Sequence, residues 1–297
     1  MAFEGHGTAD IRGIQISKIL KGFADEEFMF KSLVTNATTS AREIRWYKRE
    51  SGVLDTTDSE GMTGSRIDEG AELALLETAE QKVERQTSRI KIFGLESPWI
   101  SEEDFMDTDV QIVALNQKQV PRAVVKSVND NIYDVMSESQ SPSDLNTFAT
   151  TAVGGDQWDA ASFAAEIAMD VERAKTLIRE NNYEPTHIFL YPRAYEFVVA
   201  WLYAKGAQAP TVGSSIVQGQ QLVTLFGLRV VVSNSVVTDS VWVGNPAQVV
   251  TYWQFSPLSV QTIYDERMAA YKVVVRERGI ATLTDPKAGT LITDINT

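Results

Sequence analysis

The segment HIFLYPRAYEFVVAWL, residues 187–202, contains both kinds of secondary structure that decide the fold class. HIFLY is a short, continuous apolar run, which is typical of a buried strand. Pro192 follows it directly, and proline suits the first turn of a helix because its missing N–H would have no partner there. The segment therefore predicts a strand that ends near residue 191 and a helix over residues 193–206.

Further along, the chain reads as a succession of strands. LVTLFGLRVVVSNS (222–235) predicts a strand entered through a turn at Gly227, and VWVGNPAQVVTYWQF (241–255) predicts two strands around an Asn245–Pro246 turn. Two later segments alternate as antiparallel strands do, LSVQTIYDE and AYKVVVRERGIATL.

Two helices are predicted before residue 187. Residues 101–136 carry apolar side chains at helical spacing, including Val120, Val124 and Val128, although Pro121 should kink or divide this helix. Residues 158–182 show a second pattern of this kind. A helix, a strand and a helix followed by many strands is an α+β arrangement and not a regular βαβ repeat.

A long hairpin is predicted between residues 42 and 96. REIRWYKRES alternates like a strand, EQKVERQTSRIKIFGL is its return partner, and about thirty mostly polar residues separate them. So long a connection is uncommon inside a compact domain, so we expect the hairpin to reach away and contact a neighbour. Its first strand carries basic and aromatic side chains, which either pair with acidic patches on that neighbour or form a solvated face: Arg42, Arg45, Trp46, Tyr47, Lys48 and Arg49.

The composition excludes several classes of protein. The 297 residues include 27 Lys and Arg against 40 Asp and Glu, a net charge of −13, which argues against a cationic surface that grips nucleic acid. There is no Cys, so disulfides, thiol nucleophiles and thiolate metal sites are excluded. No apolar stretch is long enough for a membrane span, and the first residues lack the order of a signal peptide.

Catalytic signatures are also missing from the sequence. A Ser-His-Asp relay would depend on His187 alone, and neither a G-x-S-x-G elbow nor a phosphate-binding or H-E-x-x-H motif occurs. The acidic run SPWISEEDFMDTD (97–109) raises the question of a metal site at Asp107 and Asp109. Residues two apart on a helix point to different faces, so we interpret the run as a helix start with Ser101 as its N-cap.

Four stretches, in this order, resemble the major capsid protein of tailed viruses, which has the Hong Kong 97-like fold. ISEEDFMDTDVQI resembles the acidic start of the family's long spine helix, and HIFLYPRAYEFVVAWL resembles the strand, proline and helix of its axial domain. LVTLFGLRVVVSNSV resembles a strand of that domain, and the segment from VWVGNPAQVV to TDPKAGTLI resembles the family's closing strands. The resemblance extends from about residue 14 to residue 293.

The resemblance implies a division of the chain. Residues 1–41 would be an N-terminal arm and residues 42–96 an extended loop that lies over the next subunit. Residues 97–157 and 246–297 would build a peripheral domain, and residues 158–245 an axial domain.

The resemblance also implies a structural role without catalysis, cofactor or metal. Copies would assemble as pentamers and hexamers, in the host cytoplasm, into the icosahedral head of a virion that encloses double-stranded DNA. An encapsulin, a bacterial cargo compartment with the same fold, is the alternative. A hydrolase that uses Asp107 and Asp109 with a divalent metal is a third reading, from another class.

The implied partners are further copies of the chain, DNA held without sequence preference, and separate scaffold, portal and decoration proteins, with no membrane. Some members carry a long scaffolding segment; here some forty residues precede the loop, which favours a separate scaffold or none. Some members cross-link through a loop lysine, but between Arg49 and Lys82 this chain has no lysine, so we expect non-covalent stabilisation. Inter-subunit contacts are expected at Arg42, Arg45, Trp46, Arg49 and Arg66.

Overall fold

The structure, a computed structural model, describes residues 29–49, 83–103, 112–138, 144–151, 156–160, 166–204 and 223–296. Its helices are α2 (Met29–Leu33), α4 (Ile112–Met136), α5 (Ile167–Glu180), α6 (Pro192–Ala204), α8 (Pro246–Val249) and the 3-10 turn η2 (Pro286–Ala288). Its strands are β1 (Thr35–Thr38), β2 (Glu43–Arg49), β3 (Val83–Arg89), β4 (Lys91–Glu96), β5 (Ile100–Ser101), β6 (Asn146–Ala149), β7 (His187–Leu190), β8 (Thr224–Leu225), β9 (Leu228–Val232), β10 (Ser240–Gly244), β11 (Val250–Asp265), β12 (Ala270–Leu283) and β13 (Gly289–Thr293).

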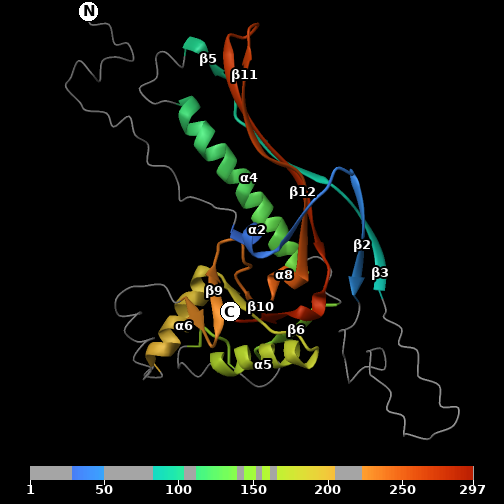
Figure 1. The fold of residues 1–297 in the computed structure, drawn as a ribbon. Coiled ribbons are helices and arrows are strands. Elements are labelled where there is room, and N and C mark those ends of the chain that lie inside the picture. Colours follow the sequence, from blue (N-terminus) through green and yellow to red (C-terminus); the bar gives the residue numbers. More distant parts are fainter. Residues whose placement is uncertain are drawn as a thin grey trace, which may run out of the picture.

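Three sheets organise these strands (Figure 1). The first has the order β1-β11-β12-β4, with β5 also paired to β12, and its long β11–β12 pair runs beside α4. The second has the order β6-β13-β10-β7-β9-β8 and lies with α5 and α6 at the other end of the molecule. Among the described strands, β2 and β3 pair with each other alone, and they stand to one side of the β11–β12 pair. The predicted α+β class is confirmed.

The segment 187–202 folds as predicted. Ile188, Phe189 and Leu190 of β7 are fully buried between neighbours β9 and β10, which explains the unbroken apolar run. Pro192 is the first residue of α6. The next predicted strand is a tight β8–β9 hairpin, and Gly227 adopts a φ of +81° in its turn, a value that glycine tolerates without a Cβ penalty.

The two strands predicted around residues 249–266 are a single strand. β11 runs from Val250 to Asp265, and its pairing with β12 shifts register between Gln254 and Ser256 and again before Ser259. Pro257 lies within the second shift, between Ser256 and Ser259, and a proline without an N–H is tolerated in a strand at such irregularities. The sequence analysis treated the end of VWVGNPAQVVTYWQF and the segment LSVQTIYDE as separate strands, which was wrong because the ladder bulges at Pro257 and then resumes.

Two other expectations about strand pairing need correction. The predicted Asn245–Pro246 turn is the short helix α8, and it connects strands of two different sheets, β10 and β11. The return segment of the hairpin is divided as well: β3 pairs with β2, whereas β4 leaves it and pairs with β12. The hairpin is thus anchored to the first sheet through its returning strand.

α4 is the long helix of the molecule, and Pro121 does not divide it. Val120, Val124 and Val128 are buried, as their spacing predicts, and the buried face continues through Ile132 and Met136. Glu102 and Glu103 are helical and follow Ser101, the last residue of β5, whereas Asp104 to Gln111 lie outside the described residues. The helix start predicted after Ser101 is therefore described only at Glu102 and Glu103, and Asp107 and Asp109 fall outside the described part.

The second predicted helix begins later than expected. α5 starts at Ile167, and Trp158, predicted as its first residue, lies in a turn. Trp158 is nevertheless buried, and its Nε1 donates a hydrogen bond of 2.9 Å to Asp170 Oδ2. The predicted helix was too long at its start because a buried side chain can pack on a helix without belonging to it. The helix ends at Glu180, before Asn182 with its positive φ of 61°.

Buried side chains gather in two large clusters. One joins α5 and α6 to the six-stranded sheet, around Ile167, Val171, Ile188 and Val198. The other joins α2 and α4 to both large sheets, and the ring of Trp242 lies at its centre, 5.1 Å from the ring of Phe189. The six-stranded sheet also includes β6 and β13, which the sequence assigned to the peripheral domain. The four-part division of the chain stays a prediction, with sheet membership differing from it at these two strands.

Candidate assembly surfaces

The β2–β3 hairpin presents two different faces. Ile44, Trp46 and Lys48 alternate on one face, and these side chains are buried or half-buried. Trp46 Nε1 donates to Ser88 Oγ over 2.9 Å, and its ring packs against the central core. The opposite face holds exposed Arg45 and Tyr47 together with Arg85 and Arg89 of β3.

The structure therefore separates the side chains that the sequence grouped as contact candidates. Arg42 and Arg45 are exposed, whereas Trp46 faces its own subunit. Arg49 is the last residue of β2, but its side chain lies outside the description, as does all of Arg66. Among the described candidates, Arg42 and Arg45 are the exposed ones.

Lys48 ties the hairpin to the end of α4. Its Nζ lies 3.6 Å from Glu138 Oε1 and also binds Asp144 Oδ2. Glu138 has a positive φ of 48°, and its Oε2 accepts hydrogen bonds from the backbone N–H groups of Asp144 and Leu145. One carboxylate thus organises the turn after α4 and holds a lysine from a strand about ninety residues earlier.

A buried ion pair joins α2 to β12. Lys31 Nζ lies 2.5 Å from Glu277 Oε1, and the Tyr252 hydroxyl donates to the same oxygen over 3.1 Å. Glu277 is fully buried, and its Oε2 accepts no hydrogen bond from the described residues. Burial and the charge of Glu277 raise the pKa of Tyr252. Gly279 makes room for this hydroxyl, since a Cβ there would lie 2.3 Å from it.

The far end of the β11–β12 pair exposes apolar side chains on both of its faces, and we call this region the hairpin tip. It consists of Val260, Ile263, Tyr264 and Met268, each between 43% and 50% exposed. Figure 1 shows β11 and β12 extending past the end of α4 with β5 beside their far end, where the Tyr264 hydroxyl donates to Glu102 Oε2 over 3.4 Å. Clustered exposed apolar side chains of this kind mark interaction surfaces.

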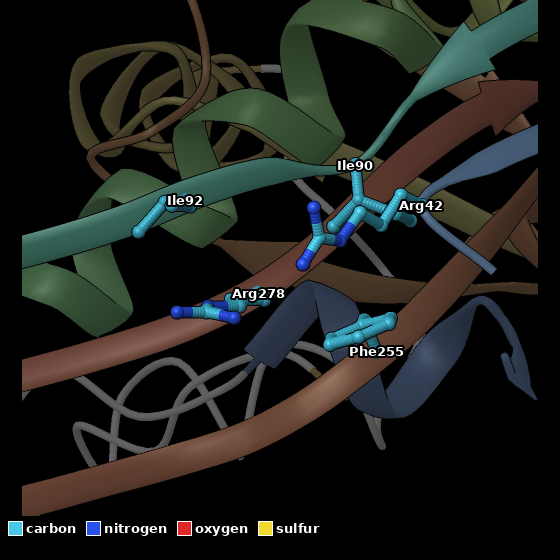
Figure 2. A pocket seen from close by; sticks show the side chains of 5 residues that line it. All are labelled: Arg42, Ile90, Ile92, Phe255 and Arg278. Atoms are coloured by element: carbon cyan, nitrogen blue, oxygen red, sulfur yellow. The ribbon is translucent and has the colours of Figure 1, made fainter. Parts of the chain in front are cut away.

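A cavity of ≈ 320 Å³ lies where the hairpin base meets the first sheet (Figure 2). Its lining combines two guanidinium groups with three apolar side chains: Arg42, Ile90, Ile92, Phe255 and Arg278. The sequence analysis identified Arg42 but missed Arg278 and Phe255. The register of strand pairing places these two residues at the site. The available signal was the alternation of β12, which places Arg276 and Arg278 on one face.

His187, considered above for a Ser-His-Asp relay, contacts a threonine and a phenylalanine. Thr186 Oγ1 lies 2.7 Å from His187 Nδ1, the His187 ring stacks on Phe189, and Nε2 is buried without a partner among the described residues. Burial, and then the charge of Arg229, lower the pKa of His187. The described ranges contain no group of three or more His, Cys, Asp or Glu placed to hold a metal ion. None of the described helices is long and apolar enough to cross a membrane.

Comparison with known proteins gives one family. A sequence model of the family described as phage capsid protein matches residues 99–292 of this chain. None of the curated proteins matches.

The fold is similar to solved capsid structures over nearly its whole length. The capsid of cyanophage P-SCSP1u has a TM-score of 0.68 at 14% identity, covering 100% of this chain and 97% of that one. The capsid of an empty GTA particle has a TM-score of 0.65 at 14% identity, covering 98% and 99%. A virus-like particle from Pyrococcus furiosus has a TM-score of 0.57 at 11% identity, covering 90% and 92%.

Proposed function

Because this chain belongs to the phage capsid protein family and is a structural major capsid protein of the virion, we propose that its copies close into an icosahedral head around double-stranded DNA. The observation that carries the proposal is the family match over residues 99–292, on a fold similar to capsid subunits over the whole chain. The role is structural, and we propose that the chain carries out no catalytic step and requires no cofactor.

The subunit's shape supports assembly through repeated contacts between copies. The β2–β3 hairpin stands beside the first sheet. The hairpin tip, at the far end of the β11–β12 pair, exposes apolar side chains that a neighbour would cover. Capsid assembly is homo-oligomeric, and we propose pentamers and hexamers that share the same contacts. In this proposal residues 42–96 lie over the next subunit, and residues 158–245 surround the five-fold and six-fold positions.

The proposed contacts at the hairpin keep the predicted residues. Exposed Arg42 and Arg45 would meet carboxylates of a neighbouring copy, with Arg49 and Arg66 continuing the basic surface. Trp46 would act indirectly, since its ring packs within its own subunit and stiffens the hairpin. Exposed pairs of this kind contribute more to orientation and specificity than to affinity.

The proposed partners other than further copies of this chain are DNA and separate scaffold, portal and decoration proteins. Packaged DNA would touch the shell without sequence preference, because a chain of net charge −13 offers no general cationic surface. A scaffold and a portal would act during assembly in the host cytoplasm. A decoration protein accompanies the major capsid protein in the phage G structure, to which this chain has a TM-score of 0.62, and a similar partner is proposed here.

The alternative, an encapsulin shell around a cargo enzyme, is not favoured, because the matching family is that of phage capsid proteins. Negative-stain electron microscopy of the purified protein tests the main proposal. Closed shells of uniform diameter are expected, and shells recovered from the virion should release DNA. A purified protein that stays monomeric under all assembly conditions, or shells that hold a cargo protein instead of DNA, would overturn the proposal.

A further inference from the structure

We infer that the cavity between Arg42 and Arg278 is a docking site for a carboxylate side chain of a second copy of this chain, flanked there by an apolar residue. The inference rests on the proposed function only in requiring that copies meet in a shell. It adds a specific receptor, including two residues, Arg278 and Phe255, that the hairpin alone does not supply.

A β-bulge builds the apolar wall of this site. Gln254 pairs with Gly279 and Ser256 pairs with Arg278, so Phe255 has no partner in β12. Bulges re-aim a side chain, and here the unpaired Phe255 lines the cavity (Figure 2). On the other side of β12, Arg278 pairs with Ile92 of β4, which is 62% exposed.

The hairpin base supplies the second cation. The backbone N–H of Ile90 donates to the Arg42 carbonyl over 3.0 Å, which fixes the chain just before β2 against the chain just after β3. The Arg42 side chain extends from this fixed point toward the cavity (Figure 2). Two guanidinium groups from segments more than two hundred residues apart therefore line one space.

Neither arginine has a carboxylate partner among the described residues. The contrast with Arg276, two positions from Arg278, is direct: Arg276 Nη2 lies 3.0 Å from Glu96 Oε1. Glu96 also binds Lys272, and Lys272 and Arg276 together lower the pKa of its carboxyl. In a chain with 40 Asp and Glu against 27 Lys and Arg, two arginines without a carboxylate partner in the described part of the chain are a local excess of positive charge.

The lining favours a protein side chain over a phosphate of DNA. A guanidinium binds either anion through paired N–H groups, so charge alone does not choose between them. The three apolar side chains would stay uncovered beside a phosphate, whereas an acidic peptide with a neighbouring apolar residue would bury them. A second copy supplies such a peptide at fixed geometry around the shell, since the same acidic chain surrounds every subunit.

Photo-cross-linking tests which molecule enters the cavity. A photoreactive phenylalanine derivative replaces Ile92, and shells are assembled from equal amounts of 14N-labelled and 15N-labelled chains. The expected result is a cross-linked peptide of mixed isotope composition in which the captured partner contains Asp or Glu. Cross-links confined to chains of one isotope, or to DNA or another protein, would overturn the inference.

Charge reversal tests what the arginines contribute. Arg42→Glu/Arg278→Glu should reduce the yield of closed shells about ten-fold or more, because like charges would then face each other. Both side chains are exposed, so the urea midpoint of the unassembled subunit should not change. Lys118→Glu/Arg193→Glu changes the net charge equally at exposed positions elsewhere and is the matched control.

The outcomes separate this inference from the proposed function. If wild-type protein forms no shells, the proposed function fails first. If wild-type shells form and the Arg42→Glu/Arg278→Glu variant assembles like the control, the proposed function stands and the docking site is wrong.

Discussion

Glu277 is a charged residue in the interior of the first sheet, and Lys31 is the cation that compensates it. A carboxylate without solvent is tolerated only with a close partner and hydrogen bonds, and here Lys31 and Tyr252 both bind Oε1. Because Lys31 belongs to α2, this pair also fixes the segment that precedes β1 onto the sheet.

Removal of Lys31 should therefore be far more harmful than removal of both charges. We expect Lys31→Met to lower the free energy of unfolding by about 3–5 kcal/mol, since it leaves a buried carboxylate uncompensated. Lys31→Met/Glu277→Gln should cost clearly less. Urea unfolding of the unassembled subunits measures both values, and equal losses would show that the uncompensated charge is not the cause.

His187 should contribute a pH dependence of stability. Its pKa in the folded chain is lowered by burial and Arg229, below an unfolded value of about 6.5. The unfolded chain then binds more protons below that value, so the contribution of the neutral ring is complete above pH 6.5 or so and is lost as the pH falls through the folded pKa. Wild-type protein should lose more stability than His187→Asn between pH 7.5 and pH 5, measured by urea midpoints. Parallel losses in the two proteins would contradict this.

At the scale of elements, the hairpin depends on its connection to the end of α4. In the described part of the chain β2 pairs with β3 alone, and an isolated two-stranded sheet is marginally stable. Trp46 on one strand and the Lys48–Glu138–Asp144 group at its end supply the missing anchorage. The direction in which the hairpin leaves the subunit follows from this anchorage.

Lys48→Ala should loosen the hairpin as a unit. We expect the free energy of unfolding to fall by about 1–3 kcal/mol, because Glu138 stays largely buried without its cation. We also expect faster amide hydrogen exchange in β2 and β3. Lys126→Ala is the matched control, since Lys126 and Asp130 form an exposed pair at 3.2 Å whose removal should cost about 0.5 kcal/mol or less. Unchanged exchange in β2 of the Lys48→Ala protein would disprove the anchoring role.

At the scale of the molecule, we expect surfaces that the described part of the subunit leaves uncovered to become the contacts of the shell. The hairpin tip lies at the end of the longest strand pair. Its apolar side chains gain by burial at roughly 25 cal/mol per Å² of apolar area, and the shell's symmetry repeats that gain at every equivalent contact.

Charges at the tip should block assembly without unfolding the subunit. Ile263 and Met268 are 43% and 50% exposed, so Ile263→Asp/Met268→Asp should change subunit stability by only about 0.5 kcal/mol per site. We expect electron microscopy to show no closed shells of this variant. Met169→Asp, at a 64% exposed position on α5, is the control and should assemble. Normal shells from the tip variant would remove the tip from the assembly interface.

The shell should be held together without covalent bonds. The chain has no Cys, and no lysine occurs between Arg49 and Lys82 to form a loop cross-link. Assembled shells boiled in detergent should therefore run as a single monomer band on a denaturing gel. A ladder of higher bands would contradict this expectation.

The elements of the fold could be predicted from the sequence, whereas the lining of the cavity at Arg42 could not, for a physical reason. Periodicity reports which side of an element is buried, so β7, α6 and the valines of α4 were readable in advance. Arg278 and Phe255 were not, because their meeting with Arg42 depends on a bulge in β11 and on the pairing of β4 with β12. Strand partners distant in sequence leave no local signal.

The sequence by itself determined the α+β class, the order of the elements, the long hairpin and, by resemblance, the capsid fold. These follow from local patterns of apolar side chains, turns and proline, which act within a few residues. The tertiary structure alone decided that β3 and β4 belong to different sheets, that Lys48 and Lys31 pair with carboxylates of the same subunit, and that Arg42 and Arg278 line one cavity. Which charges stay available for a second chain depends on the distances that folding creates, and these are set by packing across the whole molecule.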